Sequence, residues 1–188
     1  MELIIIRGQQ NGGKTTTATM LHNTLVGRSS AVRLLKTNGD YLSVGQDIFD
    51  FKSVIDLGKK RVAIISAGDV DDTLNEEMEK LIEVYRPDIL VVCARTKDYP
   101  GSSHRMLTEK YGDNINPENV FRVDYTDDPA LMLDAKRAVV KKIANKIDKF
   151  FYSIFNIYIY FCFYFNYFIY FIVIFTFFFV FIIYYYEK

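Results

Sequence analysis

The residues best suited to chemistry lie near the amino terminus, where a glycine-rich loop follows a short apolar run. The order is Leu3-Ile4-Ile5-Ile6-Arg7 and then Gly8-Gln9-Gln10-Asn11-Gly12-Gly13-Lys14-Thr15-Thr16. The glycines permit backbone angles that turn successive amides toward one centre, which makes a nest for phosphate oxygens. A helix that starts at the lysine points the positive end of its dipole at the same anion. The loop is therefore expected to hold a polyphosphate through its main chain.

Two side chains of this loop supply chemistry that the amides lack. The Lys14 ammonium is expected to reach the β- and γ-phosphates of a nucleoside triphosphate, and the Thr15 hydroxyl to ligate Mg²⁺. A glycine turn that has this spelling by chance is the alternative, and the apolar run before it and the helical pattern after it argue against that alternative. The predicted contacts to the triphosphate are Gly8, Gln9, Gln10, Asn11, Gly12, Gly13, Lys14, Thr15 and Thr16.

Apolar periodicity places the loop at the edge of a sheet. Almost continuously apolar runs alternate with stretches of helical spacing along residues 1–149, which is typical of parallel strands covered on both faces. The predicted fold class is α/β, a three-layer parallel sheet of about five strands. The pattern predicts strands over 2–7, 31–36, 61–66, 89–94 and 119–123, and helices over 14–26, 46–57, 72–85, 102–111 and 129–147.

The segments that follow the strands should complete the site, because ligands of such sheets lie at the carboxyl ends of the strands. Asp69 follows the strand over 61–66 and is expected to hold the magnesium ion or its water, with Asp71 as second choice. A helix N-cap is the alternative role for an aspartate at this place.

Two arginines are candidate catalytic cations. Arg95 ends the strand over 89–94, and Arg105 lies on the next predicted helix. Either guanidinium could offset the negative charge of a transferring phosphoryl group or hold an anionic second substrate. An exposed surface arginine is the alternative for Arg105.

The composition changes abruptly at residue 150. Residues 150–186 contain only Phe, Tyr, Ile, Val, Asn, Ser, Thr and Cys, so a nucleotide-binding domain over 1–149 is set apart from a hydrophobic tail over 150–188. The uncharged length exceeds the ~20 residues of a membrane helix. However, aromatic residues fill its middle, where natural spans favour Leu, Ala and Gly, and its residue types have AT-rich codons. A read-through artefact, a membrane segment and a packed core element are the three alternatives.

Charge and leader signals limit the remaining classes. The chain has 23 Lys and Arg and 23 Asp and Glu, so no basic field predicts nucleic-acid binding. The apolar run over 3–6 is too short for a signal-peptide core, which favours a cytoplasmic location, with membrane association through the tail if that tail spans. Cys93 and Cys162 show no metal or redox spacing.

The glycine loop, the apolar strand that ends near Asp69 and the alternating elements together resemble the P-loop NTPase superfamily over residues 1–149. The run from Gly13 to Thr17 looks like the branch of ParA/MinD-type ATPases and dethiobiotin synthetase, although Gln9 stands where the ParA/MinD type has an additional lysine. The guanine motif of GTPases is missing, so the resemblance implies ATP with Mg²⁺.

Two kinds of function are compatible with this resemblance. The first is an enzyme, an ATPase or a small-molecule kinase, that hydrolyses ATP or transfers its γ-phosphoryl group to a small acceptor. The alternative is a nucleotide-dependent switch module that binds a protein partner without significant turnover. The acceptor and the partner are not specified by the sequence.

Overall fold

The computed structural model describes residues 1–28, 33–38, 50–58, 60–67, 71–97, 100–112 and 115–150. The chain forms two compact units, Met1–Ile147 and Asp148–Lys188. The first unit carries the glycine loop and nearly all of the described residues.

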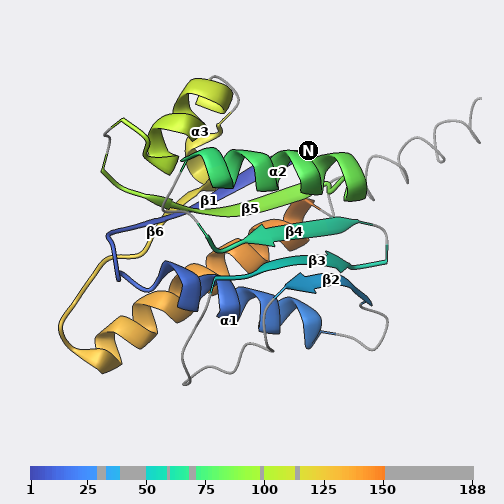
Figure 1. Cartoon of the computed structure of the whole chain (residues 1–188). Coiled ribbons are helices and arrows are strands. Elements are labelled where there is room, and N and C mark those ends of the chain that lie inside the picture. Colours follow the sequence, from blue (N-terminus) through green and yellow to red (C-terminus); the bar gives the residue numbers. More distant parts are fainter. Residues whose placement is uncertain are drawn as a thin grey trace, which may run out of the picture. The chain divides into compact units, whose positions relative to one another are not determined.

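The described residues of this unit form a six-stranded sheet with helices on both faces (Figure 1). A helix over residues 129–150 follows the last strand. In chain order the preceding elements are β1 (Glu2–Gly8), α1 (Lys14–Val26), β2 (Arg33–Asn38), β3 (Lys52–Asp56), β4 (Arg61–Ile65), α2 (Asp71–Tyr85), β5 (Ile89–Arg95), α3 (Ser103–Tyr111), the 3₁₀ turn η2 (Pro117–Asn119) and β6 (Val120–Arg122).

The sheet is mostly parallel, with the strand order β2-β3-β4-β5-β1-β6. The neighbours β4, β5, β1 and β6 pair in parallel, whereas β3 is antiparallel to both β2 and β4. The predicted α/β fold is confirmed. The predicted parallel sheet of about five strands is found, among the described residues, as a mostly parallel sheet of six strands in which β3 runs antiparallel to its neighbours. Since β1 lies between β5 and β6, the glycine loop leaves the sheet between two parallel neighbours.

The predicted helix over 46–57 is wrong where the structure describes it. Residues 52–56 form β3, and residues 46–49 lie outside the described residues. Ser53, Val54 and Ile55 are all fully buried, as in a strand that is covered on both faces. The apolar residues Ile48, Phe51 and Ile55 have the spacing of a helix. A run this short fits the period of a strand as well as that of a helix, so its spacing does not decide between them.

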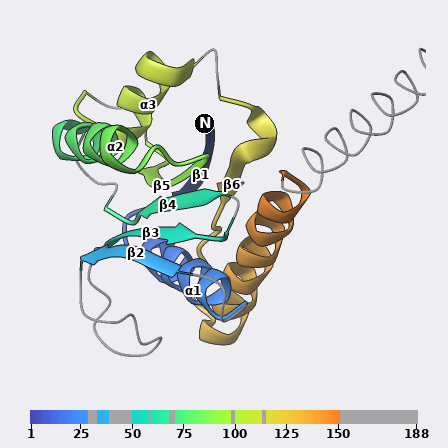
Figure 2. The same cartoon turned by 90° about the vertical axis from the view of Figure 1, so that its right-hand side faces the viewer.

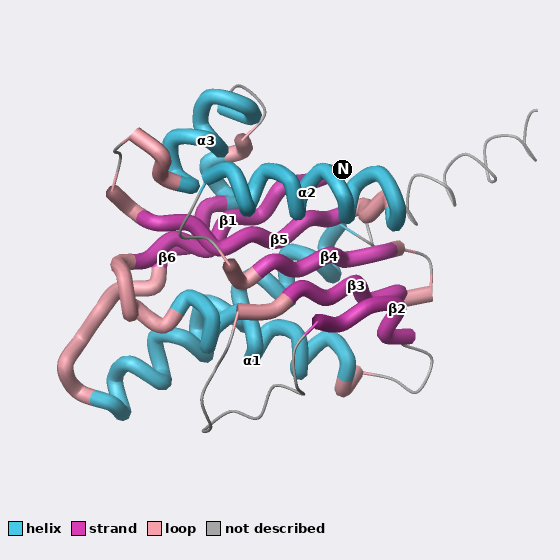
Figure 3. Tube along the Cα trace, viewed as in Figure 1, coloured by secondary structure: helices cyan, strands magenta, loops and turns pink. Residues whose placement is uncertain are grey.

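Helices cover both faces of the sheet (Figures 2 and 3). On one face, Leu3 and Ile5 of β1 share a core cluster with residues of α2 and α3, Met78 and Leu107 among them. The alternate residues of β1 are also buried, and they point to the face that α1 and the helix over 129–150 cover. Burial on both faces explains the continuous apolar spelling of β1 and β5.

The predicted tail over 150–186 lies almost wholly outside the described residues, which end at 150. Within the described part of the chain, no helix combines the length and the apolar character that crossing a membrane requires.

Candidate functional site

The glycine loop, residues 8–16, turns tightly between β1 and α1. The amide of Gly12 donates to the carbonyl of Gln9 over 3.1 Å, and Asn11 and Gly13 have positive φ angles of 58° and 76°. Gly13 is the N-cap of α1 and offers no side chain to the first helical turn. The first amides of a helix have no intrahelical acceptor, so those of α1 are available to an anion.

Among the described residues, the buried Lys14 ammonium has a single hydrogen-bond acceptor. Its side chain is 7% exposed, and its Nζ donates to the carbonyl of Gln9 over 2.8 Å. A Cβ on Gly8 would lie 2.9 Å from the Lys14 Cγ, so the glycine at the end of β1 makes room for the lysine stem. An ammonium has three donors, which leaves two for phosphate oxygens. Buried charges are normally paired, so this site fits an anion.

Thr15 lies at the meeting point of α1, β3 and β4. Its Oγ1 donates to Oδ1 of Asp50 over 3.0 Å, and the Ser66 hydroxyl donates to the same oxygen over 3.3 Å. The amide of Phe51 in turn donates to the Ser66 hydroxyl over 2.7 Å. A carboxylate and hydroxyl oxygens are the hard ligands that Mg²⁺ prefers, so Thr15 and Asp50 fit a magnesium ion that also binds phosphate oxygens.

Asp50 is the site residue that sequence reasoning missed. It lies two residues before the start of β3, the strand that was predicted as part of a helix. Because β3 is antiparallel to β4, its amino end lies at the carboxyl edge of the parallel strands. An aspartate followed by the short apolar-rich run over 51–55, which fits a buried strand as well as a helix, was the available signal.

The predicted metal residue Asp69 lies outside the described residues. The end of β4 nevertheless reaches the Thr15 side of the sheet edge, since Ser66 hydrogen-bonds Asp50. Within the described residues, no group of three or more His, Cys, Asp or Glu side chains could hold a metal ion unaided.

The two predicted catalytic arginines occupy different places. Arg95 is the partner of Gly8 in the register of β5 and β1, so its backbone lies beside the start of the loop. Arg105 lies on α3, where its Nε donates to Oε1 of Glu109 over 2.8 Å. The N-cap of that helix is Ser102, whose hydroxyl accepts a hydrogen bond from the amide of Arg105.

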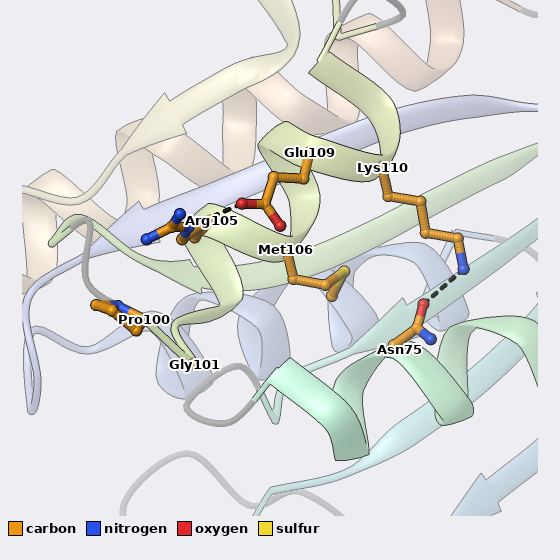
Figure 4. A pocket seen from close by; sticks show the side chains of 7 residues that line it. All are labelled: Asn75, Pro100, Gly101, Arg105, Met106, Glu109 and Lys110. Carbon is orange, nitrogen blue, oxygen red and sulfur yellow. Dashed lines mark hydrogen bonds and ion pairs between the residues drawn. The ribbon is translucent and has the colours of Figure 1, made fainter.

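Arg105 lines an open cleft between α2 and α3 (Figure 4). Across this cleft Lys110 donates to Oδ1 of Asn75 over 2.6 Å and to a carboxylate oxygen of Glu79. The hydrogen bond with Glu79 raises the pKa of Lys110, and the same bond lowers the pKa of Glu79. Both cations of the cleft are already paired with carboxylates, so it is less suited to an anion than the loop. The lining residues are Asn75, Pro100, Gly101, Arg105, Met106, Glu109 and Lys110.

A buried histidine joins α1 to β3 deeper in the molecule. Nδ1 of His22 lies 2.9 Å from Oγ of Ser53, and its ring meets the Phe51 ring edge-on, with centroids 5.7 Å apart. Burial lowers the pKa of His22. This contact fixes the strand that carries Asp50 against the helix that carries Thr15.

No family model, curated protein or solved structure matches this chain.

Proposed function

We propose that this chain is a P-loop protein that binds ATP with Mg²⁺ through residues 8–16 and acts as an ATPase or a small-molecule kinase. The observation that carries the proposal is the composition of the first turn of α1. There a buried ammonium, amides without a side-chain cap and the Thr15–Asp50 pair follow one another in the chain. Each of them complements one part of a magnesium triphosphate.

The residues of the loop then have distinct roles. The amides of the loop and of α1 bind the phosphate oxygens, and Lys14 exchanges the Gln9 carbonyl for the terminal phosphates. Asp50 accepts a hydrogen bond from the Thr15 hydroxyl, which leaves the lone pairs of that hydroxyl for a cation. When bound, Mg²⁺ would neutralise charge on the transferred phosphoryl group. Arg95, Arg105 and Asp69 are the proposed residues for assistance during transfer.

The test compares ATP binding by the wild type and by Lys14→Met, which keeps the apolar stem of the side chain and removes its charge. We expect the variant to lose measurable MgATP binding while its thermal unfolding stays cooperative. Lys80→Met, a change at an exposed lysine of α2, is the matched control. The proposal is wrong if Lys14→Met binds ATP as the wild type does.

Turnover distinguishes the two kinds of function. ADP release that rises with one member of a metabolite panel would indicate a kinase, and release without an acceptor would indicate an ATPase. Tight binding with negligible ADP release would instead favour the nucleotide-dependent switch module.

A further inference from the structure

A second lysine approaches the glycine loop from the helix over residues 129–150, which runs beside α1 (Figures 1 and 2). A Cβ built on Gly13 would lie 2.2 Å from Cε and 2.9 Å from Nζ of Lys136. The end of the Lys136 side chain therefore lies against the Cα of Gly13. The Lys136 side chain fills the space that a side chain at position 13 would need. Glycine at this position therefore allows the lysine to approach, in addition to allowing the positive φ angle.

This approach places like charges together. The Lys136 ammonium lies at the amino end of α1, which carries the positive end of the helix dipole, and Lys14 is the next residue after Gly13. Among the described residues, the Lys14 ammonium donates a hydrogen bond to the carbonyl of Gln9 alone. Two ammonium groups and a helix amino end repel one another unless an anion lies among them.

Three carboxylates of the described residues have partners other than Lys136. Asp50 accepts hydrogen bonds from Thr15 and Ser66. Asp124 pairs with Arg122, and Asp128 caps the helix over 129–150 by accepting from its first amides. Within the described residues these three carboxylates are thus already engaged, which favours an added anion beside Lys136.

We infer that Lys136 is a second phosphate-binding residue of this site, which contacts the polyphosphate chain beside Gly13. The inference rests on the proposed function and extends it to specificity. With Lys14, Lys136 and the α1 amides together, the site selects ligands with two or more linked phosphates, and the affinity follows the polyphosphate more than the nucleoside. ATP, ADP and inorganic triphosphate are then all ligands, whereas AMP binds weakly.

The test uses the full-length protein and measures the Kd for MgATP and for inorganic triphosphate by calorimetry. Lys136→Met keeps the stem against Gly13 and removes the charge. Hydrogen bonds to charged groups set the expected loss of affinity at roughly 10- to 100-fold for both ligands. Lys136→Arg should recover much of the affinity, because it restores the charge. The matched control, Lys141→Met, changes an exposed lysine of the same helix and should bind as the wild type does.

A second readout separates phosphate binding from a packing role. Without ligand, Lys136→Met should unfold at the same temperature as the wild type or at a higher one, because a repulsion is removed. The inference is overturned if the wild type binds both probes and Lys136→Met binds them equally well, or if the variant is destabilised with its Kd unchanged. A wild type that binds neither probe would overturn the proposed function itself.

Discussion

Replacing Asp50 by asparagine removes one charge beside Thr15 and keeps an oxygen that can accept hydrogen bonds. The Thr15 and Ser66 hydroxyls, now 3.0 and 3.3 Å from Oδ1, can both donate to the amide oxygen of the variant. Asp50 is exposed, and exposed charge interactions contribute little to stability. We therefore expect the free energy of unfolding without ligand to change by less than about 1 kcal/mol.

The effect on magnesium binding is larger, because the ion is divalent. A carboxylate about 4 Å from such an ion contributes ~2 kcal/mol at the dielectric constant of water, which is the appropriate limit for an exposed group. This corresponds to a loss of roughly 30-fold in the affinity for MgATP. Without magnesium the sign reverses, since the same carboxylate repels the triphosphate. Asp50→Asn should therefore bind metal-free ATP more tightly than the wild type.

The assay titrates ATP into each protein with magnesium and with a chelator. Asp56→Asn makes the same change at the other end of β3, where the carboxylate accepts from the amide of Gly58, and it should alter neither affinity. The reasoning is refuted if Asp50→Asn lowers both affinities equally, because the residue would then act through packing. An unchanged magnesium dependence would place the ion elsewhere.

Two further predictions concern stability. Because burial lowers the pKa of His22 from its ordinary value of 6.5, the unfolded chain holds more protons at this ring than the folded one. The contribution of the neutral ring to the free energy of unfolding is complete above about pH 6.5 and is lost as the pH falls toward the folded-state pKa. In denaturant unfolding across this range, the free energy of unfolding should fall with decreasing pH, and His22→Gln should make that fall smaller. A chain ended after Lys149 should be soluble, unfold cooperatively and bind ATP as the full chain does, because Met1–Ile147 is a compact unit with its own core. Loss of the cooperative transition on truncation would show that the tail completes the fold.

The parts of the fold that could be predicted from the sequence are those with an unambiguous local signal. The strands β1, β4 and β5 each contain an uninterrupted apolar run of four or more residues. The helix α2 repeats Leu74, Met78 and Leu81 at helical spacing. The glycine loop could be placed because its spelling reflects local backbone requirements. For these segments, local preference and final packing agree.

The parts that could not be predicted depend on contacts between distant segments. The short run that forms β3 fits a helix or a strand equally well. It forms a strand because it pairs with β2 on one side and with β4 on the other. Asp50 gains its place only through the reversed direction of that strand. Lys136 approaches Gly13 from a helix near the other end of the first unit, and no spacing rule connects them.

The two hydrogen bonds between α1 and the β3 segment are spaced by the same distance along the helix and along the strand. Thr15 and His22 are separated by seven residues of helix, a rise of about 10 Å, and their partners Asp50 and Ser53 are separated by three residues of extended chain, again about 10 Å. The two hydrogen bonds, Thr15–Asp50 and His22–Ser53, therefore hold α1 against the β3 segment at two points about the same distance apart on each. Sliding α1 along its axis or rotating it would break both hydrogen bonds together. The first turn of α1 is therefore held in position before a ligand binds to it.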